Sequence, residues 1–443
     1  MSLFLTLFVI LILIVVATVK FKIHPVFSLI IAAILVGFLF GFKADIIISL
    51  ITDGFGKTLS SIGLIIAFGT TIGIFLENNG GTKMIAEKIL SLVSTKRSPL
   101  AMNIIGFIIS IPVFCDSGFV ILSSLNKALS KKSGIKLAIF AVALSTGLYT
   151  AHVFIPPTPG PLAAAAIIEA DLGLVMLLGI IVAIPVSFVG YVWASFIGKN
   201  IDTEENKLVE IEEKSLVTKS NNSLLVILLP LLLPIVLIAV KSVAEYPTHP
   251  FGEGGIFTVI TFIGDPSIAL LLGVIIIFMN SVNVKSDIKN EWVLRSLKES
   301  GSIILVTGAG GAFGNVLRAS ELSAVVEPGD SYLTSGLFIA FLLAALLKTA
   351  QGSSTVAIIT TAAIIGPLLS NFGLETPFEK ALSVLAVGAG SMTVSHINDS
   401  YFWVVCQFSH LSVKSALKSH TIATFFQGIT GIIIILLLQL FLS

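Results

Sequence analysis

The sequence predicts an all-α polytopic membrane protein made of two halves with inverted topology, containing about ten transmembrane helices, two re-entrant hairpins and two broken helices. The chain is 55% hydrophobic and only 12% charged, with a mean hydropathy of +1.04. Apolar runs long enough to cross a bilayer, which takes about 20 helical residues, recur along the whole length. The chain also repeats itself internally. No stretch remains that is polar enough to form a soluble domain.

Charge and cysteine content exclude several kinds of partner. The formal net charge is +1, whereas binding to nucleic acid requires a basic face. The two cysteines, Cys115 and Cys406, lie in or beside apolar segments without the spacing of a metal site. We therefore expect no nucleic acid, no cofactor and no metal, and partners limited to the lipid bilayer and a small molecule.

The basic residues predict the topology. The apolar run 1–19 lacks a signal-peptide pattern and is followed by Lys20 and Lys22, so we interpret it as a retained first helix. Segment 98–130 has Lys96 and Arg97 before it and Lys131, Lys132 and Lys136 after it, which places both flanks on the cytoplasmic side. Two full crossings need about 40 residues, more than this segment holds. We predict a re-entrant hairpin that turns at Asp116 and Ser117.

A second hairpin is predicted over 332–376, entering from the outer side between acidic flanks. If the loops between the remaining apolar runs lie alternately inside and outside, the chain makes ten crossings and both termini lie outside. The predicted division is a first half over 1–198, a cytoplasmic linker over 199–222 and a second half over 223–443. The linker is mixed in charge, as solvated linkers are.

The two halves match when the chain is shifted by 238 residues. Gly63 then falls on Gly301, and Asp116-Ser117 of the first hairpin falls on Ser354-Thr355 of the second. In the same register Thr158–Pro161 falls on His396–Asp399. Since the hairpins enter from opposite sides, the halves are predicted to be inverted repeats, the arrangement by which a carrier alternates access around a central site.

Two apolar segments are interrupted by polar or proline-rich stretches. Pro156–Pro161 interrupts the predicted helix 136–170, and Ser395–Ser400 interrupts 380–410. Unwound backbone inside a membrane is tolerated only where it is buried in protein or lines a watery cavity. We therefore expect both breaks and both hairpin tips to meet in one polar site near the midplane.

Three residues at these positions are candidates for proton coupling. Carboxylates at membrane depth are functional candidates by default, which selects Asp116 and Asp399; the alternative is that each only caps a broken helix. His396 either titrates or serves as a structural donor.

Short polar side chains near the same positions suit a small polyhydroxy anion, with its carboxylate at a helix N-terminus. Lys348 either pairs with that carboxylate or extends to the outer interface. His152 and Glu169, which flank the proline-rich break, are secondary candidates. The predicted substrate-binding set is Asp116, Ser117, Thr158, Lys348, Ser353, Ser354, Thr355, His396, Asn398 and Asp399.

Glycine-rich stretches are predicted to serve helix packing. Gly308–Gly314 is similar to a dinucleotide-binding loop, but that function requires a preceding strand, and this stretch lies in a membrane helix. Small residues there favour close approach of helices. By the same reasoning the run Gly37–Gly41 suggests a homodimer interface.

Five stretches carry a family resemblance, and they run in order through nearly the whole chain: Phe114–Val120, Phe154–Pro161, Gly308–Gly314, Ala350–Ala357 and Ser395–Ser400. In these motifs the chain resembles the gluconate permease family of bacterial inner-membrane symporters, part of the ion-transporter superfamily. The resemblance implies proton-coupled uptake of gluconate or a related acid such as idonate, fructuronate, glycerate or D-serine.

Two positions depart from the family's pattern. Lys348 stands where many relatives have arginine, and Arg318 follows the glycine run where a smaller or apolar residue is usual. Lysine cannot make the bidentate contact that arginine makes with a carboxylate.

Other functions remain as alternatives to a proton-coupled carrier. A sodium-coupled carrier of dicarboxylates would keep the fold and hold sodium at the hairpin tips. A membrane enzyme would use Asp116, Asp399 and His396 for acid-base chemistry, but no nucleophile or metal motif accompanies them. A channel would need a ring of like charges or a carbonyl filter, and neither pattern is present.

Overall fold

A computed structural model describes residues 16–17, 21, 23–91, 93–201, 224–245, 251–252, 254–282, 284–320 and 333–442. All regular secondary structure in these ranges is helical. The predicted first helix over 1–19 lies outside the described residues except at 16–17. Residues 202–222 of the predicted linker, 321–331 before the predicted second hairpin, and residue 332 at its start also lie outside them.

Both halves contain the same series of elements: a long helix, a hairpin, a broken helix and another long helix. The first half comprises α2 (Pro25–Leu39), α3 (Ala44–Asn78), α4 (Gly81–Ser91), α5 (Ser98–Ile109), α6 (Cys115–Ser133), α7 (Leu137–Phe154), α8 (Pro159–Ile168) and α9 (Leu172–Ile197), with short 3-10 turns η1 (Thr95–Arg97) and η2 (Gly198–Asn200).

The second half begins with a helix, a bent pair and a long helix: α10 (Leu224–Ala244), α11 (Gly255–Ile263), α12 (Pro266–Asn280) and α13 (Ser286–Ala319). It continues with the hairpin, the broken helix and the last helix: α14 (Leu333–Gln351), α15 (Ser354–Ile365), η5 (Gly366–Leu368), η6 (Ser370–Phe372), α16 (Pro377–Met392), α17 (Ser400–Phe408), α18 (Val413–Ala416), the π-helical turn η7 (Leu417–Thr421) and α19 (Ile422–Leu442).

Six helices in the described residues are long and apolar enough to cross a membrane, or seven with the α11–α12 pair, which is bent by 64°. The polytopic all-helical class is therefore confirmed. The apolar run 23–42 corresponds to the shorter α2, and the predicted segment 380–410 corresponds to the broken pair α16–α17. The number ten, the inverted relation and the outer position of the termini stay predictions.

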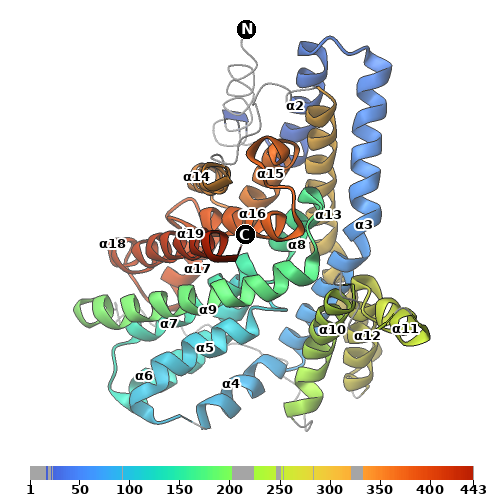
Figure 1. The fold of residues 1–443 in the computed structure, drawn as a ribbon. Helices are drawn as coiled ribbons and strands as arrows, with labels where there is room; N and C mark the ends of the chain where they lie inside the picture. The colour runs from blue at the N-terminus through green and yellow to red at the C-terminus, as the bar shows by residue number, and fades with distance from the viewer. Residues whose placement is uncertain are drawn as a thin grey trace.

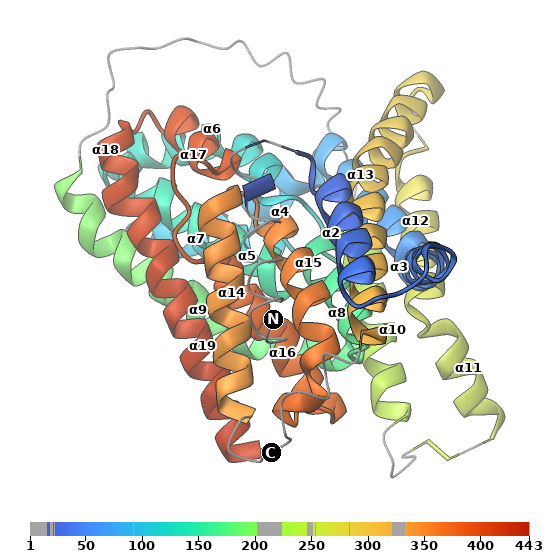
Figure 2. The same ribbon diagram turned by 90° about the horizontal axis from the view of Figure 1, so that it is seen from above.

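The two hairpins flank the broken helices. In Figure 1 the α5–α6 hairpin (cyan) and the α14–α15 hairpin (orange) lie on opposite sides of α7, α9 and α16. The view in Figure 2 shows α9, α19 and α14 along one edge of the molecule and α3, α12 and α13 along the other. Long helix α3 packs along α13 more extensively than any other helix pair. These two form a wall beside the hairpins and breaks.

Glycines bring that wall together. An added Cβ on Gly311 would overlap the Thr58 hydroxyl, and one on Gly54 would meet Asn315 Cβ at 2.6 Å. Within α13, Gly308 and Gly311 thus pack against α3, while Gly310 and Gly314 pack against α15, as the packing interpretation expects. Gly37, by contrast, packs on Ile47 of its own chain. Its contact joins α2 to α3, and the homodimer stays a prediction.

The turn of the first hairpin is earlier than predicted. Helix α5 ends at Ile109 and α6 begins at Cys115, so the turn covers 110–114, and Asp116 and Ser117 lie in the first turn of α6. Pro112 lacks the backbone N–H that a continuing helix needs, so the helix stops before it rather than at the polar pair.

Both predicted helix breaks are present. The first separates α7 from α8 at 155–158 and contains the cis peptide bond Pro156–Pro157. The second separates α16 from α17 at 393–399, where Val394 has φ 57°. A β-branched residue in the left-handed region is strained, and surrounding structure must hold it there.

Candidate functional site

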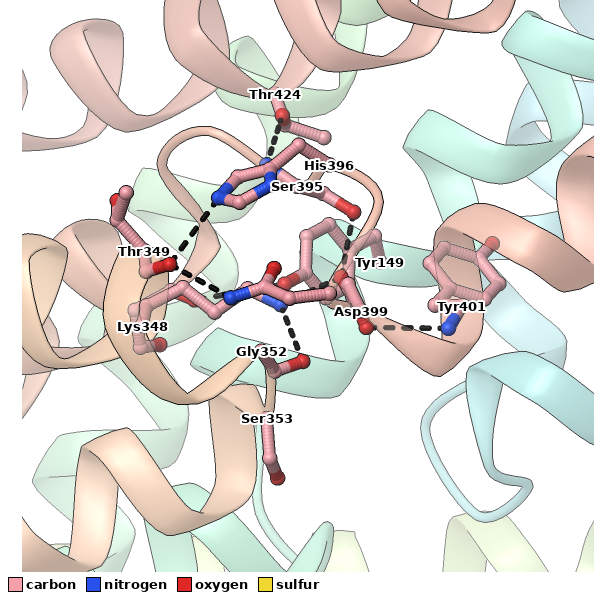
Figure 3. A network of polar contacts seen from close by, with 12 residues as sticks. Tyr149, Lys348, Thr349, Gly352, Ser353, Ser395, His396, Asp399, Tyr401 and Thr424 are labelled. Atoms are coloured by element: carbon pink, nitrogen blue, oxygen red, sulfur yellow. Dashed lines mark hydrogen bonds and ion pairs between the residues drawn. The ribbon is translucent and has the colours of Figure 1, made fainter. Parts of the chain in front are cut away.

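A buried ion pair joins the second hairpin to the second break. Lys348, in the last turn of α14, donates from Nζ to Asp399 Oδ2 at 2.5 Å and to the Gly352 carbonyl at 3.0 Å (Figure 3). The side chain of Lys348 is 0% exposed and that of Asp399 is 5% exposed. Lys348 is therefore enclosed by protein and does not extend to an interface. Asp399 also caps α17 by accepting from Tyr401 N at 3.1 Å, so it is both a helix cap and a charge partner.

Ser395 and His420 extend this pair into a hydrogen-bonded chain. Ser395 Oγ donates to Asp399 Oδ2 at 2.5 Å and lies 3.2 Å from His420 Nε2. The other ring nitrogen of His420 lies 3.1 Å from Ser145 Oγ on α7. The chain therefore runs from α7 through His420 and Ser395 to Asp399 and Lys348, and every side chain in it is buried.

The π-helical turn η7 explains how α19 reaches the break. Thr421 Oγ1 donates to the Ser395 carbonyl, and Ser395 N donates to Thr424 Oγ1 at 3.0 Å. A π turn places one extra residue in the helix and often marks a functional position. Here it brings His420 and Thr421 to the same serine.

Two tyrosines close the other side of the pair. The Lys348 ammonium lies 5.7 Å from the centre of the Tyr149 ring, within the range of a cation–π contact. Tyr401 donates from its hydroxyl to the Ser145 carbonyl at 3.0 Å, and the two tyrosine rings lie 5.3 Å apart. Both tyrosines are almost fully buried.

His396 and Asn398 bind the hairpin rather than the charge pair. His396 Nε2 lies 3.1 Å from the Thr349 carbonyl, and Asn398 Nδ2 donates to the same oxygen at 2.6 Å (Figure 3). A carbonyl only accepts, so this contact requires the proton on Nε2 of His396. Both side chains thus attach the break to the hairpin.

Of the hydroxyl residues at the second tip, one caps a helix and the other two contact neighbouring helices. Ser353 caps α15 by accepting from Val356 N at 3.3 Å. The buried Ser354 contacts the Tyr149 hydroxyl, and the backbone of Thr355 lies against Gly160 of α8. The tip therefore touches both breaks.

The candidates of the first half lie around the first tip. Asp116 is within electrostatic range of Lys348 and Asp399, and among the described residues no partner binds its buried Oδ1. Ser117 lies beside Glu77 of α3. Thr158 donates to the Ile155 carbonyl within the first break, and with His152 it lines a cavity of about 10 Å³ at the tip.

The structure thus assembles the second-half candidates tightly and adds Ser395, His420, Tyr149 and Tyr401, which sequence reasoning did not select. Of the first-half candidates, Thr158 and His152 line a small separate cavity, whereas Asp116 and Ser117 do not. Helices α15 and α17 carry their own N-caps, so their N-termini are not open to a substrate carboxylate here. Within the described ranges, no group of three or more His, Cys, Asp and Glu residues is arranged to hold a metal ion.

Gly352 is the residue that lets the second tip approach the second break. It has φ +81°, and an added Cβ would overlap the Asn398 carbonyl oxygen. We expect Gly352→Ala to separate the tip from the break and to reduce transport at least about 10-fold, because a rearrangement of backbone costs more than about 1.4 kcal/mol.

The matched control is Gly63→Ala, since no atom of a described residue lies within 4 Å of a Cβ added to Gly63 of α3. Uptake per reconstituted protein should be normal in Gly63→Ala. Normal uptake in Gly352→Ala would show that close docking of tip and break is dispensable.

The comparison with known families shows which family the chain belongs to. The model of the GntP family permease matches residues 1–441. The chain belongs to the GntP permease family. It is therefore a multi-pass membrane transporter and not an enzyme.

Individual relatives agree with this assignment. The permease is 33% identical to a gluconate permease of Pseudomonas aeruginosa over 431 residues, which cover 96% of this chain and 94% of the relative. It is 30% identical to the D-serine transporter DsdX of Escherichia coli O6:H1, covering 96% of each chain. The YdaH transporter of Alcanivorax borkumensis has a similar fold, with a TM-score of 0.66 and 13% identity over 95% of this permease and 99% of that chain.

Proposed function

We propose that this permease imports gluconate or a related hydroxy acid together with a proton, across a bacterial inner membrane. The observation that carries the proposal is the buried Lys348–Asp399 pair at the junction of the second hairpin and the second break. Similarity to a gluconate permease supports a sugar acid, and similarity to a D-serine transporter supports a small hydroxylated carboxylate more generally.

The pair supplies a simple coupling rule. In the empty site Lys348 and Asp399 neutralise each other. When Asp399 takes up a proton, the Lys348 ammonium is released to bind the carboxylate of the substrate, and the site is again neutral. Substrate without a proton would leave two buried anions facing one cation, which low-dielectric surroundings strongly disfavour. The site is therefore expected to change from facing one side of the membrane to facing the other only when it is empty or when it holds both proton and substrate.

The surrounding groups fit the remaining requirements. Ser353, Ser354 and Thr355 at the second tip offer hydroxyls to a polyhydroxy substrate. Lys348 is 0% exposed and Asp399 5% exposed, so the pair is enclosed, and the cavity at the first tip holds only about 10 Å³, whereas ligand sites are typically about 300–1,000 Å³. Binding is thus expected to require movement of the hairpins and breaks against the α3–α13 wall, as alternating access demands.

A second candidate is sodium coupling with a dicarboxylate substrate. The buried Asp116 Oδ1, which no described residue binds, favours it, because a cation would satisfy this oxygen. Asp116 then holds the coupling ion and Asp399 stays a structural partner of Lys348.

Uptake into proteoliposomes separates the two candidates. Labelled gluconate should accumulate in sodium-free buffer when the outside is more acidic than the lumen, and a protonophore should abolish the accumulation. Unlabelled glycerate, D-serine and dicarboxylates added as competitors would rank the substrates. Accumulation that appears only after sodium is added would contradict proton coupling and favour the second candidate.

A further inference from the structure

A polar cavity of about 350 Å³ lies away from the Lys348–Asp399 pair, between the α3–α13 wall and the end of the first broken helix. Its lining comes from the outer parts of α3 and α13 in the predicted topology, from the end of α8 with the residues that follow it, and from Pro367 of η5. Three of its lining residues are charged: Lys57 of α3, Arg318 of α13 and Glu169 at the end of α8. The volume is sufficient for a small organic acid.

The charged residues that line this cavity carry a net positive charge. Glu169 Oε1 accepts from Lys57 Nζ at 2.8 Å and lies 3.6 Å from Arg318 Nη1. One carboxylate therefore faces two cations. The hydrogen bond from Lys57 is the largest of several contacts that lower the pKa of Glu169, so the pairing favours its ionised form. A planar guanidinium has five donors and matches a carboxylate bidentately, so Arg318 is suited to a second carboxylate.

The cations and the carboxylate stand on different parts of the fold. Lys57 and Arg318 belong to the wall that glycines bring together, where Gly54 and Gly311 leave no space between helices. Glu169 is the C-cap of α8, with φ 59° and ψ 43°, so it ends the broken helix that carries the proline-rich break. An anion that replaced Glu169 at the two cations would therefore act where the wall meets the broken helix.

We propose that this cavity is an outer capture site for small hydroxy-carboxylate anions, in which the carboxylate of the ligand pairs with Arg318 and Lys57 and displaces Glu169. The outer position rests on the predicted topology, and the role in import rests on the proposed function. Clefts of one charge raise the local concentration of oppositely charged ligands and their association rate. The site is expected to affect capture of substrate and not its passage through the core.

Charged thiol reagents measure the cavity directly, without requiring transport. Ser61 lines the cavity and is exposed, so Ser61→Cys supplies a reporter, while the native Cys115 and Cys406 are buried. An anionic methanethiosulfonate should react with Ser61→Cys about fivefold to tenfold faster than a cationic one, the effect expected of one or two partly exposed charges. Ala166 of α8 also lines the cavity, so Ala166→Cys is a second reporter.

Charge-removing variants test the assignment of the cations. Lys57→Gln with Arg318→Gln should abolish or reverse the preference for the anionic reagent, because it leaves the Glu169 carboxylate without its two cations, whereas Glu169→Gln should increase the preference. The matched control is Lys83→Gln with Lys88→Gln on α4, which removes the same charge from exposed positions outside the cavity. If the variant without Lys57 and Arg318 prefers the anionic reagent as strongly as the control double variant does, the proposal is overturned.

Protection and kinetics complete the test. Gluconate at millimolar concentration should slow modification of Ser61→Cys in wild-type surroundings and not in the Lys57→Gln, Arg318→Gln background. The same background should raise KM for uptake about tenfold with kcat within twofold of wild type.

Failure of proton-coupled uptake in the unmodified permease would contradict the proposed function alone, since the reagent preference does not depend on it. Absence of protection by gluconate and by every competitor acid would overturn the capture site.

Discussion

Replacement of Asp399 by asparagine is expected to abolish net proton-driven uptake while leaving exchange of internal for external substrate. In Asp399→Asn the loaded site pairs Lys348 with the substrate carboxylate and is neutral. The loaded site can therefore change its access from either side of the membrane to the other. The empty site then holds an unpaired buried ammonium. Breaking a buried pair costs about 3–5 kcal/mol, so return of the empty site should slow at least about 100-fold.

Two assays on the same proteoliposomes measure this difference. Net uptake is followed with an inward proton gradient, and exchange with equal unlabelled substrate on both sides and label outside. Lys348→Met should lose both activities, because its loaded site contains an unpaired carboxylate. The surface variant Asp45→Asn is the control for removal of a carboxylate, and it should retain both. Full net accumulation in Asp399→Asn would rule out Asp399 as the proton acceptor.

The stability of the permease should depend on the two charges together. Asp399→Asn and Lys348→Met each leave one charge without its partner inside the protein, at a cost of about 3–5 kcal/mol. The double variant Lys348→Met, Asp399→Asn removes both charges. Since replacement of a buried ion pair by uncharged residues is often neutral or stabilising, the double variant should regain most of the lost stability.

Thermal unfolding in detergent, followed by the fraction that remains monodisperse, reports the four proteins on one scale. The expected order is wild type and double variant above both single variants. The double variant should still lack coupled uptake, which separates stability from mechanism. Losses that simply add in the double variant would mean that the two residues act independently and would contradict the pairing.

Local patterns were enough to predict the elements around the site. The scarcity of charge identified the membrane class, and polar or proline-rich interruptions in apolar runs placed both breaks within a few residues. The turn of the first hairpin was misplaced, because the polar pair Asp116 and Ser117 was taken as the turn, while Pro112 ends the first leg. Polarity marks a hairpin tip less directly than loss of a backbone donor does.

Side-chain partners were much less predictable. Lys348 and Asp399 were both selected as candidates, but not as partners, because their pairing depends on how hairpin and break dock. His420 was missed for a related reason: it contacts Ser145 at a separation of 275 positions and depends on a π-helical turn that the sequence pattern does not reveal. A single histidine in an apolar segment carries no signal of its contacts. Long-range packing therefore defines the site, and local sequence only supplies its parts.

Proton entry driven by substrate alone tests the central claim most directly. Proteoliposomes with a pH-sensitive dye in the lumen, in sodium-free buffer and without an imposed pH gradient, are given gluconate or the best competitor acid outside. The account predicts acidification of the lumen in proportion to substrate uptake in the wild-type permease, and none in Asp399→Asn under conditions where it exchanges substrate. Substrate entry without acidification in the wild type would contradict coupling through the Lys348–Asp399 pair.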